Sequence, residues 1–379
     1  MNFINKKGKI FYGIFLSISL MSTKGYADYM YKGIEIVPTA SVQESYDSNV
    51  TYVKNNPISD AITKLMVGLG FKQEGKTQSL SLDTRVEEEL YAQHSTFDNT
   101  SEYLNLLFDK DFSDFDHLKV TDAFSHSEDP TSFENAFGST SGRFGTYQND
   151  ATLAFHHDLN ENLAIDFNYA NDLLDFTNNS SNSVSNTVGT GLEYTLNSAT
   201  ILKTNYNYIY RNFYPGSAAT ENEISGGVRR YLTNQLYLDV ISGADIIHSF
   251  NGRNNVEPLY KISLTNELDK TTQTGISFEK RYTTTGYTQD VFNSWRVSAN
   301  YIKNLTSRII ATLSVFFGDG TYVSTPIKEK YTGASIAVSY DLTKNSQLTL
   351  SETFSQDDST LQSNTYTKNV VFLGVTYKF

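Results

Sequence analysis

Apolar and polar side chains alternate along most of the chain. Every second residue is apolar across 65–71, 163–169, 295–301, 309–317 and 334–340. Because successive side chains of a β-strand point to opposite faces, each of these stretches would present one apolar face and one polar face. The alternation predicts a succession of half-buried strands rather than helices.

A leucine recurs at nearly constant spacing between the predicted strands, beside Asn, Asp, Thr or Ser. Its positions, which are 36 or 37 residues apart, are Leu159, Leu196, Leu232, Leu268, Leu305 and Leu342. A fixed period indicates that one supersecondary unit is repeated. We expect this unit to contain two strands of about ten residues, one short turn and one longer loop.

The turn positions set the expected size of the sheet. Short turns are predicted near 74–76, 109–117, 158–162, 195–200, 232–235, 267–273, 302–307 and 341–346. With a first strand near 36–46 and a last strand over 367–379, the chain would hold about 18 strands (roughly 16–20). The period is irregular over 90–150, and this region accounts for most of the range.

Two features favour a membrane barrel over a soluble β-propeller or a long sandwich. Tyr194, Tyr231, Tyr301 and Tyr340 end strands before short turns, as the aromatic girdles of membrane barrels do. The face opposite the apolar one carries Ser, Thr, Asn, Gly and scattered charge, which suits a wet lumen. Since a sheet in lipid must pair all its backbone groups, it must close on itself. We therefore predict an all-β fold: a transmembrane antiparallel β-barrel with short periplasmic turns, embedded in outer-membrane lipid.

The N-terminus has the layout of a cleaved secretory signal peptide. Lysines precede an apolar stretch of about a dozen residues, and the small residues of Gly-Tyr-Ala precede Asp28. The alternative is a buried N-terminal helix. We expect residues 1–27 to form the signal peptide and residues 28–379 to form the outer-membrane β-barrel.

The charge and the cysteine content exclude some functions. The formal net charge is −12, and residues 1–27 contain lysines but no acid, so their removal makes the chain more acidic still. Nucleic-acid affinity comes from cations that neutralise phosphates, so no nucleic-acid partner is expected. The chain has no Cys and forms no disulfide.

The last residues, "NVVFLGVTYKF", form another strongly alternating stretch. They resemble the C-terminal strand that the bacterial barrel assembly machinery recognises in outer-membrane proteins. Gly374, Tyr377 and Phe379 match that pattern, while Phe372 stands where it has a polar residue. The resemblance implies that the barrel assembly machinery is a partner and that this strand closes the barrel.

Candidate catalytic and metal-binding stretches fail on spacing. "HSFNG" (248–252) is similar to a His-x-Ser-Asn-Gly stretch of outer-membrane phospholipases, but His248 and Ser249 are adjacent and point to opposite faces. The same argument separates the two histidines at 156–157. "DKDFSDFD" (109–116) lacks the Gly at position six and the Glu at position twelve of a calcium loop. We expect no enzyme activity, no cofactor and no metal ion.

Strand parity assigns side chains to the lumen. The candidate pore-lining residues are Arg85, Lys203, Arg229, Asp239, Glu279, Arg281, Arg296 and Arg308. One hypothesis is a hydrophilic wall of balanced charge that keeps the channel wet. The other is a constriction in which Arg281, Arg296 and Arg308 face acids across the pore.

Aromatic residues are sparse on the predicted inward positions. Those that parity places there are Tyr103, Tyr237, Phe316 and Phe372, and they form no clear track for a sugar. The longest loop, 127–146, would either fold inward and narrow the pore or remain an ordinary extracellular loop.

The stretch "IVPTASVQESYDSNVTY" (36–52) resembles the opening strand of a family of outer-membrane β-barrel porins. Members of that family are associated with exopolysaccharide export systems of the Wzx/Wzy type. The resemblance implies an exit conduit for an exopolysaccharide, biofilm or capsular polysaccharide, acting with a periplasmic polysaccharide-export protein. The alternative is a diffusion porin for small solutes or sugars. No functional residue carries over from the resemblance.

Overall fold

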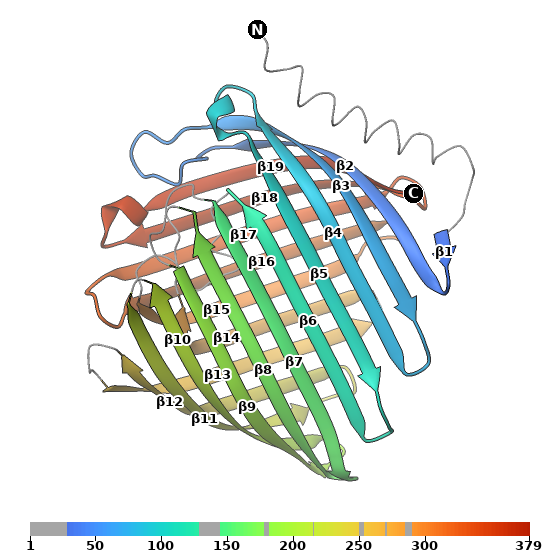
Figure 1. The fold of residues 1–379 in the computed structure, drawn as a ribbon, viewed down its shortest axis with the longest axis vertical. Coiled ribbons are helices and arrows are strands. Elements are labelled where there is room, and N and C mark those ends of the chain that lie inside the picture. Colours follow the sequence, from blue (N-terminus) through green and yellow to red (C-terminus); the bar gives the residue numbers. More distant parts are fainter. Residues whose placement is uncertain are drawn as a thin grey trace.

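The barrel wall is a single antiparallel sheet whose strands pair in chain order (Figure 1). The computed structural model describes residues 29–128, 145–177, 182–214, 216–249, 254–269, 271–284 and 290–379. Within these residues the wall has 18 strands, as predicted. They are β2 (Ile34–Asp47), β3 (Asp60–Glu74), β4 (Gln78–Tyr91), β5 (Asn99–Asp111), β6 (Asp116–Ser127), β7 (Thr146–Asn160), β8 (Leu163–Phe176), β9 (Asn182–Asn197), β10 (Thr200–Tyr214), β11 (Ser217–Tyr231), β12 (Leu236–Ser249), β13 (Asn254–Asp269), β14 (Thr272–Thr284), β15 (Val291–Asn304), β16 (Ile309–Tyr322), β17 (Lys328–Asp341), β18 (Ser346–Ser359) and β19 (Tyr366–Lys378).

The ring closes between its last and first strands. β19 pairs with β2 from Val370–Asp47 to Lys378–Thr39, and the Phe379 N–H donates a hydrogen bond to the Pro38 carbonyl (3.0 Å). A short strand β1 (Tyr29–Tyr31) folds back on the start of β2. Closure gives the wall no free sheet edge, as a sheet in lipid requires.

The three residues of the predicted assembly signal lie at this closure. Tyr377 points outward, and its ring packs edge-on against Phe379 at 4.8 Å between centroids. Gly374 points inward, where a Cβ atom would lie 2.8 Å from the Phe372 ring, so a side chain would displace that ring. Recognition by the assembly machinery remains a prediction.

The short connections lie together at one end of the barrel, which we name the turn end. They join β3 to β4, β5 to β6 and each later odd-numbered strand to the next, at the predicted positions. The Thr306 hydroxyl accepts hydrogen bonds from the N–H groups of Arg308 and Ile309, and Thr233 and Thr343 act in the same way. In outer-membrane barrels such turns face the periplasm.

The opposite end of the barrel, which we name the loop end, carries most of the longer connections. One connection there is short: only residues 215 and 216 separate β10 from β11. Gly216 has φ +94°, a left-handed conformation that Gly adopts without steric cost. The short 3₁₀ turns Ser95–Phe97 and Gln362–Asn364 also lie in loop-end connections.

The outward face is apolar and exposed, as contact with lipid requires. It carries Leu373, Val375 and, at the turn end, the repeated leucines Leu159, Leu196, Leu232, Leu305 and Leu342. The leucine period in the sequence therefore places these five apolar side chains at the turn-end rim. Among the described residues, no helix combines the length and the hydropathy that a membrane-spanning helix needs.

One residue of the predicted aromatic girdle lies on the other face. Tyr194, Tyr301 and Tyr340 point outward, whereas Tyr231 pairs with Tyr237 on the lumen side, with ring centroids 5.7 Å apart. The strand reverses immediately after Tyr231, and Leu232 takes the outward position.

Two predictions fall on other parts of the chain. The signal peptide (1–27) lies outside the described residues, and so do residues 129–144 of the longest loop.

Candidate channel lining

The lumen wall is polar, and its two ends differ in packing. At the turn end, ionisable side chains are partly exposed and form neighbouring ion pairs. At the loop end, several charged and aromatic side chains lose almost all contact with solvent, including Glu89, Glu221, Asp245, Glu329 and Tyr331. The loop end is therefore closely packed, while the turn end is open.

Three of the predicted cations face the lumen beside aromatic or acidic partners. The Arg85 guanidinium on β4 lies 4.0 Å from the Tyr103 ring centroid on β5. Lys203 on β10 forms an ion pair with Glu193 on β9. Arg229 on β11 forms an ion pair with Asp239 on β12.

Arg229 and Asp239 form the best-defined pair at the turn end. The Arg229 Nε and Nη2 atoms donate to the two carboxylate oxygens of Asp239 at 2.8 and 2.9 Å. The guanidinium also lies 4.8 Å from the Tyr237 ring centroid. These side chains are partly exposed, so solvent screens the pair.

Glu279, Arg281 and Arg296 share the inner face of β14 and β15. Glu279 lies beside both cations: it forms an ion pair with Arg281 at 3.0 Å and is the direct cross-strand partner of Arg296. The Arg296 guanidinium lies 4.2 Å from the Phe316 ring centroid. Each of these two arginines therefore has an acidic or aromatic partner on its own strand or on a neighbouring strand.

Arg308 lies outside the strand wall, contrary to the prediction. β15 ends at Asn304 and β16 begins at Ile309, so Arg308 is an exposed residue of the turn between them. Its carbonyl accepts a hydrogen bond from the Asp341 N–H (2.8 Å). Parity alone extended the strand through the turn and misplaced this residue. The predicted row of three arginines does not form.

A row of acids lies on the inner face of β7, β8, β11 and β12. Asp150 and Asp172 are direct cross-strand partners, and Glu223 and Asp245 are another such pair. Among the described residues, none of the four forms an ion pair at hydrogen-bonding distance. We name these four residues the acidic row.

Two arginines on other strands act electrostatically on the acidic row. Arg211 on β10 and Arg281 on β14 both interact with Asp172 of β8 and with Glu223 of β11. For Arg281 and Arg296, the constriction stays a prediction.

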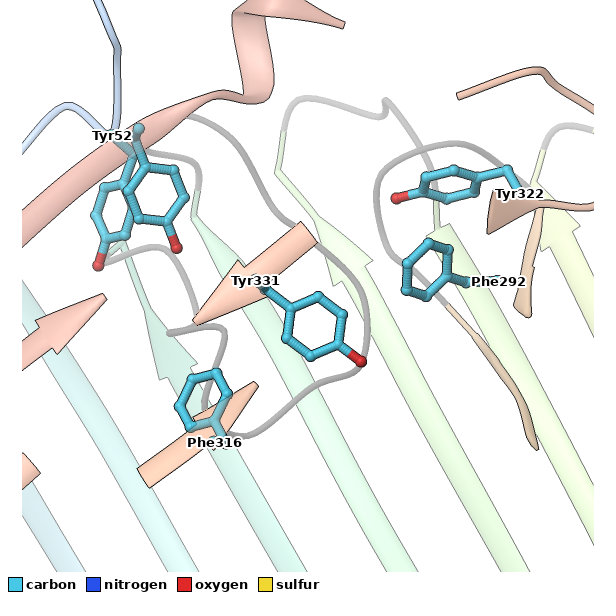
Figure 2. Packing of buried hydrophobic residues seen from close by; sticks show 6 residues of the cluster. Tyr52, Phe292, Phe316, Tyr322 and Tyr331 are labelled. Carbon is cyan, nitrogen blue, oxygen red and sulfur yellow. The ribbon is translucent and has the colours of Figure 1, made fainter. Parts of the chain in front are cut away.

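An aromatic cluster packs inside the barrel near the loop end, and sequence analysis missed it. Figure 2 shows the rings of Tyr52, Phe292, Phe316, Tyr322 and Tyr331; Tyr366 completes the cluster. The Tyr331 hydroxyl donates a hydrogen bond to the Trp295 carbonyl (3.0 Å). Tyr52 belongs to the connection between β2 and β3, so the cluster fixes that connection to the wall.

Glycines make room for these rings. A Cβ atom at Gly333 would lie 2.2 Å from the Phe316 ring, and one at Gly318 would lie 2.5 Å from Tyr331. Phe316 and Gly333 are cross-strand partners, as are Gly318 and Tyr331. A glycine opposite an inward aromatic residue is the sequence feature that indicates this cluster. It can be recognised only when the strand register is known, because the two residues lie on different strands.

Buried ion pairs hold the loop end together. Arg211 donates to Glu221 Oε2 through Nε (3.1 Å) and Nη2 (2.8 Å), and both side chains are less than a tenth exposed. Lys368 forms an ion pair with Asp47 at 2.7 Å and lies 3.8 Å from the Tyr52 ring centroid.

Asp60 anchors the connection between β4 and β5 at the loop-end rim. Its carboxylate accepts hydrogen bonds from the backbone N–H groups of Gln93 and His94 and contacts the His94 ring at 2.8 Å. Burial acts to raise the pKa of Asp60, but these hydrogen bonds together hold its pKa below the ordinary value of 3.8.

Residues 267–379 match a family model described as "Putative beta-barrel porin 2". The match covers the end of β13 and the whole of β14–β19, so it includes one of the two strands that close the ring. The protein is a β-barrel channel of the bacterial outer membrane. No curated protein matches the chain.

Solved outer-membrane proteins share the general barrel form at very low identity. OccK2 (OpdF) of Pseudomonas aeruginosa, solved in complex with glucuronate, has 10% identity and a TM-score of 0.49 over 91% of this chain and 98% of its own. OpdQ of the same organism has 11% identity and a TM-score of 0.46 over 93% of this chain and 99% of its own. OccAB3 of Acinetobacter baumannii has 12% identity and a TM-score of 0.46 over 92% of this chain and 100% of its own. The fold assignment rests on the strand pairing of the chain itself.

Proposed function

We propose that this channel lets small polar solutes diffuse across the outer membrane and that it prefers cations. The observation that carries the proposal is the acidic row. Like charges directly opposite each other across two strands destabilise a sheet, so the Asp150–Asp172 pair carries a structural cost. Acids without ion-pair partners attract cations into the lumen and repel anions.

The width of the barrel and the family match also support diffusion. A ring of 16–18 strands leaves room for an aqueous channel. The matched family carries the description of a porin. The export conduit and its periplasmic polysaccharide-export partner, which the N-terminal resemblance implied, draw no support from this match. Diffusion of small solutes therefore takes precedence over export in this proposal.

Two measurements test the proposal. In planar bilayers the purified protein should form open channels, and a KCl gradient should give a reversal potential of the sign that marks cation preference. In proteoliposomes, small neutral sugars should enter while large oligosaccharides do not. Anion preference, or permeation independent of solute size, would overturn the proposal.

A deletion strain separates diffusion from export. We expect surface polysaccharide to be unchanged and a small cationic solute to enter more slowly, with the rate of entry restored by the wild-type gene. Loss of surface polysaccharide while the polymer still accumulates inside the cell would favour the export conduit instead.

A further inference from the structure

Three of the six histidines lie at the turn end of two neighbouring strands. His117 is on β6, and His156 and His157 are on β7. His117 and His156 are direct cross-strand partners on the inward face, whereas His157 points outward beside Asp116. The pairing of β6 with β7 therefore brings together two imidazoles that are 39 residues apart in the sequence.

Carboxylates surround the inward imidazoles. His117 Nδ1 lies 2.8 Å from Asp111 Oδ1, and His117 Nε2 lies 3.4 Å from Asp109 Oδ2. One ligand atom from each of Asp109, Asp111 and His117 lies within 4.8 Å of the others. His156 lies between Asp166 (2.7 Å) and Asp158 (3.2 Å). The inner rim over β5–β8 thus carries two imidazoles and four carboxylates.

This combination of ligands suits a transition metal. Imidazole nitrogen with carboxylate oxygen is a ligand set that Zn²⁺ and its neighbours accept, whereas Ca²⁺ prefers oxygen alone. The side chains stand on β-strands, which hold ligands more firmly than a loop does. They are also partly exposed (39% for His117), so an ion can reach them from solvent. Lys119, the cross-strand partner of Asp109, is the neighbouring cation that the site must tolerate.

We propose that Asp109, Asp111 and His117 bind a divalent transition-metal ion at the turn-end mouth of the channel, beside the imidazole of His156. Sequence analysis dismissed both stretches because it judged each strand alone. The adjacent histidines at 156–157 do face opposite ways, but the partner of His156 comes from the next strand. An ion bound here would place positive charge at the mouth of the channel and would slow the passage of cations.

Calorimetric titration of the full-length, detergent-solubilised barrel with ZnCl₂ tests the site. Wild-type protein should bind one Zn²⁺ saturably, and His117→Ala should bind with an affinity about tenfold or more lower. Asp111→Asn, which keeps the side-chain shape, should also weaken binding. His157→Ala is the matched control, since it removes the same side chain one residue from His156 on the outward face, and it should bind as wild type does.

The outcomes are decisive in both directions. Heat-modifiable migration in gels first confirms that each variant is folded. Wild-type protein that does not bind Zn²⁺ would overturn the site, and so would equal binding by wild type and His117→Ala, or equal loss in His157→Ala. The titration does not depend on the proposed transport function. Zn²⁺ block of wild-type current, absent in His117→Ala, would add a second readout in bilayers.

Discussion

The two ends of the lumen use similar side chains for different purposes. Arg211–Glu221 at the loop end and Arg229–Asp239 at the turn end both join neighbouring strands through two hydrogen bonds. The loop-end pair is almost fully buried (8% and 1% exposed), whereas the turn-end pair is partly exposed (30% and 16%). Burial therefore makes one pair a structural element and leaves the other as part of a wet channel wall.

Removing the arginine of each pair should show this difference most strongly. Arg211→Ala leaves Glu221 buried without its partner, and we expect it to lower the free energy of unfolding by about 3–5 kcal/mol. Arg229→Ala should cost only about 0–1 kcal/mol, because water solvates Asp239. Urea unfolding of the two variants in detergent micelles measures both values. Equal losses would mean that the two ends are packed alike.

A tyrosine pair on one strand sharpens the comparison between the interior and the lipid face. Tyr331 is fully buried in the aromatic cluster and donates to the Trp295 carbonyl, while Tyr340 is 37% exposed on the outward face. Tyr331→Phe should cost about 1 kcal/mol through the lost hydrogen bond. Tyr340→Phe should leave the free energy of unfolding almost unchanged. The same unfolding assay checks both, and a larger cost at Tyr340 would contradict the account.

The Asp60 anchor gives a smaller effect that depends on pH. Because its folded pKa lies below the ordinary 3.8, its contribution to stability is present above that value and is lost as pH falls through the folded pKa. Hydrogen-exchange protection of residues 92–98 should therefore fall in acid. Asp60→Asn should lower that protection already at neutral pH. Protection that is unchanged in this variant would exclude the anchor.

Local patterns in the sequence were enough to predict the wall of the barrel. Alternation located the strands, and the repeated leucine located most of the turns, because five of these leucines lie exposed at the rim beside polar residues in the reversal. Parity also placed Arg85, Arg229 and Arg296 on the inward face, where the structure has them. Parity failed at Arg308, where the strand has not yet begun. At Tyr231 the girdle assignment was wrong, because Tyr231 lies two residues from Arg229 and shares its inward face.

Features that depend on strand register could not be predicted from the sequence. The aromatic cluster needs Gly333 opposite Phe316, and the histidine rim needs His117 opposite His156. These partners come from different strands, so no pattern within one strand reveals them. The acidic row has the same origin, since Glu223 and Asp245 become neighbours only when β11 pairs with β12.

The acidic row is the source of the proposed cation preference. The decisive measurement is the reversal potential of Asp172→Asn/Glu223→Gln in planar bilayers under a KCl gradient, with Glu352→Gln, whose side chain faces lipid, as the control. We expect the double variant to lose most of the wild-type cation preference and the control to keep it. A double variant with the reversal potential of wild type would contradict the account.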